Sequence, residues 1–202
     1  MSLAELIEMT RLYANMSSHP SPNHSDLARL RERIRTVPNW PAPGVMFRDI
    51  TPLLQDGESF GSAIAHLAQA CADVSVDVVV GIEARGFIFG AALAHALNLG
   101  FVPMRKQGKL PFSSIAQPSV HEYGEAVLEL HSDALKPGQR VMLVDDLIAT
   151  GGTVLAAQKL IKRLDAQVTV VAALIVLPDV GGSGRLHDAG MDVRTLLAFD
   201  GH

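Results

Sequence analysis

The sequence contains very little cysteine. Of its 202 residues only Cys71 is a cysteine, so no internal disulfide can form, and we expect a reducing compartment. Cys71 lies in an apolar stretch with helical spacing. This setting predicts a buried core thiol rather than a catalytic nucleophile.

The sequence also lacks an excess of basic residues. Lys and Arg number 17 against 21 Asp and Glu, which gives a formal net charge of −4. A protein that binds nucleic-acid backbones should carry a basic excess. We therefore predict no nucleic-acid partner, and the cations that are present must act locally.

A long hydrophobic run is missing as well. The longest apolar stretch, residues 168–177, is too short to span a bilayer and predicts a buried strand. Glu5 and Glu8 stand where a secretory signal would be basic and then apolar. We expect a cytoplasmic protein with no membrane partner.

Apolar residues make up 48% of the chain, enough for a substantial core in one domain. We divide the chain into an N-terminal extension, residues 1–24, with a short amphipathic helix and a flexible joint, and a domain, residues 25–202. In that domain Ser25 is expected to cap a helix that Pro38 stops, and Ser59 to begin a second helix.

From residue 78 the pattern alternates between strand and helix. Strands are predicted at 78–80, 101–104, 141–144 and 168–177, with helices at 89–97 and after residue 153. Residues 105–131 interrupt this alternation with a basic loop and an exposed strand at 127–131, and residues 181–184 are expected to form a flexible loop. The predicted fold is α/β: a doubly wound, mainly parallel sheet with flanking helices and an inserted flexible hood.

Residues 141–153 form the most informative segment. An apolar strand is followed by Asp145 and Asp146 and then by the small-residue turn Thr150, Gly151, Gly152 and Thr153. Such a turn at a helix N-terminus can surround a phosphate with backbone N–H groups. Carboxylates beside it would repel a bare phosphate unless they meet hydroxyls or a divalent metal, which indicates a ribose phosphate.

Two other phosphate loops are excluded in this segment. The turn has no Lys after a glycine, as a Walker A loop requires, and no Gly-x-Gly-x-x-Gly dinucleotide pattern. A plain strand-turn-helix corner would explain the two glycines alone but is disfavoured for the whole segment.

Other candidate segments precede and follow this turn, and each has a simpler alternative. Residues 81–86 offer backbone donors and the Arg85 guanidinium, or form an ordinary turn. Arg105, Lys106 and Lys109 suit a departing pyrophosphate, or form a solvated charge run. Phe47 supplies an aromatic face, or fills the core.

Segment 141–153 resembles the phosphoribosyl pyrophosphate motif of the type I phosphoribosyltransferases. Segments 41–50, 81–90, 105–111 and 122–124, in the same order, narrow the resemblance to the adenine-specific members, over about residues 27–178. The resemblance implies transfer of the 5-phosphoribosyl group from 5-phosphoribosyl 1-pyrophosphate to adenine, giving AMP and pyrophosphate. It also implies a homodimer, in which a neighbouring subunit can supply one of the basic-loop cations.

The resemblance assigns each segment a role. The 5-phosphate would be held by Ala149, Thr150, Gly151, Gly152 and Thr153, and the ribose hydroxyls by Asp145 and Asp146. Mg²⁺ would bind the pyrophosphate and the ribose hydroxyls, with Asp145 and Asp146 as candidate ligands. The implied pyrophosphate residues are Glu83, Ala84, Arg85, Arg105, Lys106 and Lys109, with a cis peptide bond at Glu83-Ala84, and the implied adenine residues are Met46, Phe47, Arg48 and Leu147.

The catalytic assignments fall on the hood and the basic loop. By resemblance, Glu122 handles the proton of the purine, Tyr123 closes over the pyrophosphate and Arg105 stabilises the leaving group. The sequence departs from the family pattern at residues 118–121, which puts hood closure in question, and His121 is an alternative acid or base. Two other functions stay open: a non-catalytic nucleotide-sensing regulator and a transferase for another base.

Overall fold

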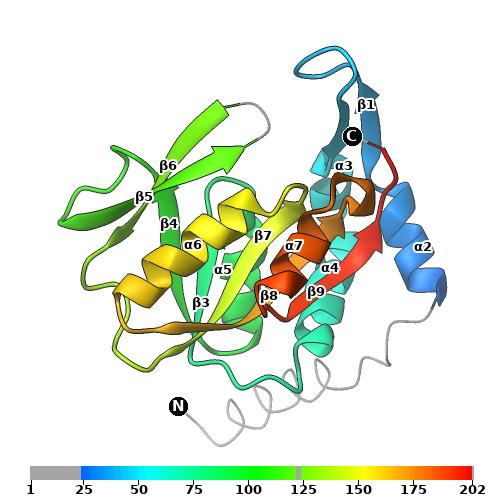
Figure 1. Cartoon of the computed structure of the whole chain (residues 1–202). Helices are drawn as coiled ribbons and strands as arrows, with labels where there is room; N and C mark the ends of the chain where they lie inside the picture. Colours follow the sequence, from blue (N-terminus) through cyan, green and yellow to red (C-terminus); the bar gives the residue numbers. More distant parts are fainter. Residues whose placement is uncertain (1–23, 122–123, 202) are drawn as a thin grey trace, which may run out of the picture.

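The computed structural model describes residues 24–121 and 124–201, so the predicted extension lies outside the described residues except for its last residue. Its main feature is a seven-stranded sheet in the order β5-β6-β4-β3-β7-β8-β9 (Figure 1). The strands are β3 (Val78–Ile82), β4 (Gly100–Lys106), β5 (Ser114–His121), β6 (Gly124–His131), β7 (Arg140–Ile148), β8 (Gln167–Val176) and β9 (Val193–Ala198). The five strands from β4 to β9 are parallel, while β6 and β5 are antiparallel, which confirms the predicted α/β sheet.

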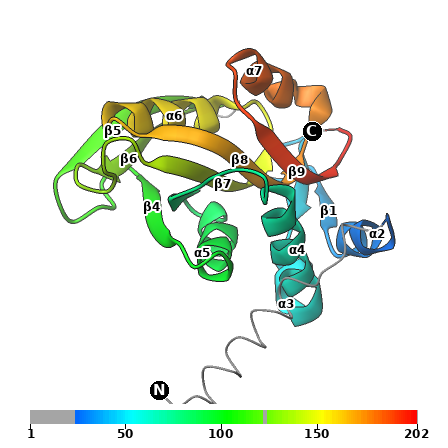
Figure 2. The same ribbon diagram turned by 90° about the horizontal axis from the view of Figure 1, so that it is seen from below.

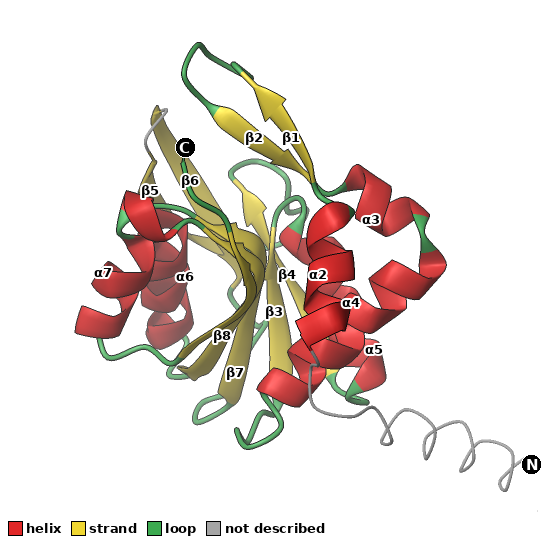
Figure 3. Cartoon of the chain, turned by 90° about the vertical axis from the view of Figure 1, so that its right-hand side faces the viewer, coloured by secondary structure: helices red, strands yellow, loops and turns green. Residues whose placement is uncertain are grey.

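Helices cover both faces of this sheet, as the turned views make plain (Figures 2 and 3). One face carries α2 (His24–Glu32), α3 (Thr51–Gln55), α4 (Gly57–Ala70) and α5 (Gly86–Ala96). The other carries α6 (Gly152–Arg163) and α7 (Gly182–Asp188), which follows the short 3-10 helix η1 (Pro178–Val180). No helix in the described part of the chain is long and apolar enough to cross a membrane.

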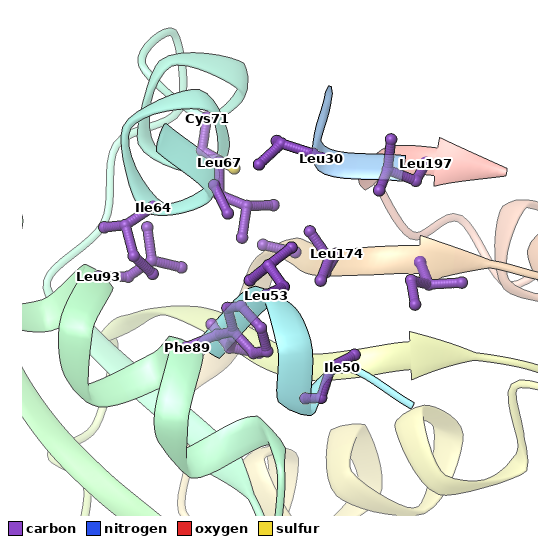
Figure 4. Close-up of a cluster of buried hydrophobic side chains, with 14 of the residues drawn as sticks. Leu30, Ile50, Leu53, Ile64, Leu67, Cys71, Phe89, Leu93, Leu174 and Leu197 are labelled. Atoms are coloured by element: carbon purple, nitrogen blue, oxygen red, sulfur yellow. The ribbon is translucent and has the colours of Figure 1, made fainter. Parts of the chain in front are cut away.

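The buried side chains form two clusters, one on each face of the sheet. Figure 4 shows the cluster under α4 and α5, where Leu53, Phe89 and Leu93 are fully buried. Cys71 belongs to this cluster and is 3% exposed. Burial raises the pKa of its thiol to about 11, so the predicted core thiol is confirmed.

Two helix boundaries were predicted wrongly. Helix α2 already includes Ser25 and ends at Glu32, and Pro38 lies in strand β1 (Arg35–Pro38) rather than stopping a helix. Helix α4 begins at Gly57, two residues before Ser59. The reason is Asp56, whose carboxylate accepts a hydrogen bond from the Glu58 N–H and caps the helix.

The hood is a β-hairpin rather than the predicted loop. Strands β5 and β6 pair along their length, and β6 joins the sheet edge opposite Arg105 and Lys106 of β4. The strand predicted as exposed at 127–131 has Leu128 and Leu130 fully buried against the α6 face. Sequence periodicity could not reveal this pairing, because the paired residues of β4 and β6 lie 22 and 24 positions apart in the chain.

Several elements were not predicted, among them α3, β5 and η1. A two-stranded ribbon of β1 and β2 (Met46–Asp49) projects beyond the sheet, as Figure 3 shows. Strand β9 completes the far edge. Residues 181–184, predicted as a flexible loop, instead form the start of helix α7 after Gly181, which adopts φ +80°.

Candidate active site

The candidate site lies where the order of the parallel strands reverses. Strand β3 is connected to β4 on one side, whereas its other neighbour, β7, is connected to β8 on the opposite side. In such sheets a crevice opens outside the carboxyl ends of the strands at this point. A cavity of about 430 Å³ is found there, lined by Arg85, Lys106, Asp145, Leu147, Ile148, Ala149, Thr150, Gly151, Thr153 and Val154.

The small-residue turn forms one wall of this cavity. Strand β7 ends at Ile148 and α6 begins at Gly152, after Gly151 has reversed the chain with φ +76°. The Gly152 N–H meets the Thr150 hydroxyl oxygen at 3.4 Å, a long and easily displaced contact. The first turn of α6 therefore presents the positive end of a helix to the cavity.

Helix α7 supports this turn from behind, a role that the sequence pattern did not predict. A Cβ atom on Gly182 would lie 1.9 Å from the Ala149 carbonyl oxygen, so only glycine allows this approach. The Arg185 guanidinium donates a hydrogen bond to the Thr150 carbonyl at 3.1 Å. The glycine-rich stretch 181–184 was the one available signal.

The two aspartates lie within strand β7, not after it as predicted. The strand continues to Ile148, where it still pairs with Val176 of β8. Asp145 lines the cavity, and its Oδ1 accepts the Asp146 N–H at 2.9 Å. Asp146 is 4% exposed and forms an ion pair with Arg85, Nε to Oδ2, at 3.0 Å.

This pair of carboxylates is short of compensating positive charge. Burial raises the pKa of Asp145 well above its ordinary value, and the charge of Asp146 raises it further. Burial also raises the pKa of Asp146, although Arg85 opposes the rise. The geometry of the Arg85 contact is not that of a hydrogen bond, so Asp146 Oδ2 has no hydrogen-bond partner among the described residues. Hydroxyl donors or a divalent cation would suit this pair.

Arg85 connects the carboxylates to the β2 segment. Its Nη1 lies 3.4 Å from the Arg48 carbonyl oxygen, and its guanidinium carbon lies 5.0 Å from the centre of the Phe47 ring. Phe47 is half-buried and is packed edge-on against Trp40 at 4.3 Å between ring centres. Phe47 is therefore not a core phenylalanine. Sequence reasoning missed Trp40, which is 52% exposed and is the only tryptophan of the chain.

The end of strand β3 holds the basic segment in place. The Glu83-Ala84 peptide bond is cis, as the resemblance implies. Glu83 accepts hydrogen bonds from the Lys106 N–H at 2.9 Å and from Arg105 Nη2 at 3.1 Å. Burial alone would raise the pKa of Glu83, but these two bonds and the Arg105 charge bring it below its ordinary value.

Only some of the predicted cations line the cavity. Arg85 and Lys106 line the cavity, whereas Arg105 points to Glu83 and to the Lys109 carbonyl, which it contacts at 3.0 Å. Glu122 and Tyr123 lie outside the described residues. Met46, Phe47 and Arg48 do not line the cavity but adjoin it through Arg85.

Comparison with known proteins agrees with this arrangement. A family model described as "Phosphoribosyl transferase domain" matches residues 53–197. The adenine phosphoribosyltransferase of Cupriavidus taiwanensis is 56% identical over 90% of this chain and 96% of its own, and that of Ralstonia nicotianae is 52% identical over 92% and 96%. The crystal structure of adenine phosphoribosyltransferase from Thermoanaerobacter pseudethanolicus is 43% identical, with a TM-score of 0.83 over 86% of this chain and 99% of that one. The chain therefore belongs to the adenine phosphoribosyltransferase family.

Proposed function

We propose that this protein is a purine salvage enzyme, which joins adenine to 5-phosphoribosyl 1-pyrophosphate and releases AMP and pyrophosphate. One observation carries the proposal: a single cavity at the strand switch point combines an anion-binding helix turn, the Asp145 carboxylate and the two cations Arg85 and Lys106. These features are complementary to a phosphorylated sugar that carries a second anionic group: the turn and the cations suit its anions, and the carboxylate suits its hydroxyls. The Saccharomyces cerevisiae relative, 36% identical, was crystallised in complex with adenine.

The ribose phosphate would occupy the wall formed by α6. The turn from Ala149 to Thr153 would bind the 5-phosphate, with the helix N-terminus supplying positive potential. Asp145 would accept hydrogen bonds from the ribose hydroxyls, because it faces the cavity with a raised pKa that such donors would lower. Asp146, held in place by its ion pair with Arg85, would be the second acceptor for the ribose hydroxyls.

The carboxylate pair also fits a Mg²⁺ ion that arrives with the substrate. Oxygen donors are what Mg²⁺ prefers, and Asp146 Oδ2 is without a hydrogen bond among the described residues. The described residues contain no cluster of three or more His, Cys, Asp or Glu side chains that could hold a metal alone. Asp145 and Asp146 would thus supply part of the coordination, and pyrophosphate and ribose oxygens the rest. The bound ion would neutralise charge on the departing pyrophosphate.

Adenine would lie beside strand β2. Phe47 and Leu147 would contact the flat faces of the base, and backbone groups of Met46 and Arg48 would read its polar edge. The position of Arg85, between Phe47 and Asp146, supports a base site next to the ribose site.

The reaction would be a displacement without a covalent enzyme intermediate. The bond from ribose C1 to pyrophosphate breaks, a bond to the adenine nitrogen forms, and the proton of that nitrogen leaves, with Glu122 as the proposed acceptor. As the pyrophosphate departs, C1 gains oxocarbenium character. Lys106 and Arg85 would stabilise the leaving group from within the subunit, and Tyr123 would close over it.

Arg105 and Lys109 would complete the pyrophosphate site in a homodimer. Neither lines the cavity of its own subunit, which supports a role across a subunit interface. Light scattering on the pure protein would test this, and a monomer with full activity would refute it.

We also propose that the enzyme acts in the cytoplasm.

A panel of bases tests the proposed reaction. Pure protein, Mg²⁺ and 5-phosphoribosyl 1-pyrophosphate would be mixed with adenine, hypoxanthine, guanine, uracil or orotate, and pyrophosphate release measured. Release with adenine alone is expected. Release with a different base would reassign the substrate, and none with any base would favour the nucleotide-sensing regulator. An Asp146→Asn variant with unchanged turnover would refute the carboxylate assignment, and Glu122→Gln with a wild-type rate across pH would refute the proton role.

A further inference from the structure

The side chain of Arg48 is buried against the C-terminal segment. It is 7% exposed, although it is a charged residue on strand β2. Its Nη1 donates to the Thr36 hydroxyl at 2.5 Å and its Nη2 to the Asp200 carbonyl at 2.6 Å. No ion pair is found for it in residues 24–121 and 124–201: two neutral oxygens and one aromatic ring contact the guanidinium, with the charges of Arg31 and Asp200 nearby.

That ring belongs to Phe199. The Arg48 guanidinium carbon lies 4.9 Å from its centre, and the Arg31 guanidinium carbon lies 4.3 Å from it. Phe199 is 7% exposed, and its N–H donates to the Val176 carbonyl at 3.0 Å beside the sheet. Arg31 also donates to the Ala198 carbonyl. Residues 198–200 are therefore fixed to the sheet and contact both α2 and β2.

The stability of strand β2 depends on these contacts of Arg48. A buried guanidinium loses its hydration, and burial accordingly lowers the pKa of Arg48. Cation–π attraction and hydrogen bonds to carbonyls offset that loss only while the partners stay in position. Because Arg48 follows Phe47 directly and pairs with Thr36 across the ribbon, displacing its side chain would shift the ribbon.

We propose that residues 198–200, with Phe199 at their centre, position strand β2 for purine binding. Phe199 is thus a positioning residue: it acts through Arg48 and touches no reacting atom. The proposal rests on the proposed function, which assigns adenine to the β2 backbone and Phe47. It predicts that a change near the end of the chain alters the use of adenine and not that of the sugar phosphate.

Three variants test this prediction. Phe199→Leu removes the ring, Phe199→Tyr keeps it, and Phe60→Leu is the matched control, because it removes a ring that packs on the same core cluster, against Phe89. Phe199→Leu is expected to raise the KM for adenine about threefold to tenfold while the KM for 5-phosphoribosyl 1-pyrophosphate stays within about twofold. Phe199→Tyr should restore the adenine KM, and Phe60→Leu should leave it unchanged.

Trp40 supplies a second readout that does not depend on activity. It is the only tryptophan and packs on Phe47, so its emission reports the ribbon. Phe199→Leu should shift its emission maximum and increase its quenching by acrylamide, whereas Phe60→Leu should not. If Phe199→Leu does not fold, Thr36→Val removes another partner of Arg48 from an exposed position and should change the same two readouts.

The outcomes separate the two proposals. If the wild type forms no AMP, the proposed function fails, and the Trp40 emission alone decides whether Phe199 positions the ribbon. If the wild type forms AMP but Phe199→Leu leaves both the adenine KM and the emission unchanged, the positioning role is refuted. Equal rises in both KM values, matched by Phe60→Leu, would show only a general loss of stability and would also refute it.

Discussion

Replacing Gly182 by alanine should damage the phosphate turn from behind, although Gly182 itself does not line the cavity. The added Cβ would lie 1.9 Å from the Ala149 carbonyl oxygen and 2.7 Å from the Gly151 nitrogen. Real Cβ atoms essentially never approach closer than 3.0 Å, so the turn and α7 must separate by about 1 Å. The neighbours are backbone atoms, which cannot rotate away as a side chain can.

The expected cost has two parts. Forcing a methyl group into a filled space typically costs about 1–3 kcal/mol of folding free energy. A displacement of about 1 Å in a binding turn can lower the rate about 100-fold, because the reactant is then held out of line. We expect a raised KM for 5-phosphoribosyl 1-pyrophosphate and a lower kcat, with the KM for adenine changed less.

The assay is steady-state kinetics together with thermal unfolding, and Gly184→Ala is the control. Gly184 lies in the same helix with nothing within 4 Å of its would-be Cβ. The control should keep wild-type kinetics, and its free energy of unfolding should increase by about 0.5–1 kcal/mol, since alanine is the better helix former. Wild-type kinetics and stability for Gly182→Ala would show that α7 does not support the turn.

Three further perturbations test the charges of the site. Burial raises the pKa of Asp145, so the folded protein binds more protons than the unfolded chain and loses stability as the pH rises through that pKa. Asp145→Asn should therefore raise the melting temperature at pH 7 while lowering activity, and the gain should vanish as the pH falls to about 4; a gain independent of pH would contradict this. Arg85→Met leaves the Asp146 carboxylate, which is 4% exposed, without its cation. The free energy of unfolding, measured in urea at pH 7, should therefore fall by about 1–3 kcal/mol. That loss should shrink in acid as Asp146 protonates, and an equal loss at every pH would mean that packing is responsible. Chelation of Mg²⁺ should abolish pyrophosphate release yet leave the melting temperature of the substrate-free protein unchanged, and a lowered melting temperature would reveal a metal held by the protein alone.

Helices and strands with strong periodicity were predictable, because each pattern reflects burial on a known face. Strand β3 is buried throughout and was recognised from three consecutive valines. Helix boundaries were less predictable, since Asp56 and Ser59 are both good caps and only the folded chain shows which one accepts the hydrogen bond. A strand at 127–131 was predicted and lies in β6, but its burial was predicted wrongly and strands β5 and β9 were missed. The pairing of β6 with β4 and of β9 with β8 joins segments that are distant in sequence.

The candidate site divides in the same way. The phosphate turn was readable because its chemistry depends on a few consecutive residues, from Asp145 to Thr153, whose types and order limit what the turn can bind. Its resemblance to a family added roles for segments that periodicity alone would have left as ordinary turns. Confirmation of the cis bond at Glu83-Ala84 shows how far such a local resemblance reaches.

The fold class, the phosphate turn and the set of charged residues available to the site could all be predicted from the sequence, since each depends on residue types close together in the chain. The folded structure was needed to show which side chains meet: Arg85 with Asp146, Arg105 with Glu83, and Arg48 with Phe199. It also placed Gly182 against the turn from more than thirty residues away. Contacts of this kind depend on how strands are ordered and helices packed, and no local pattern records that order.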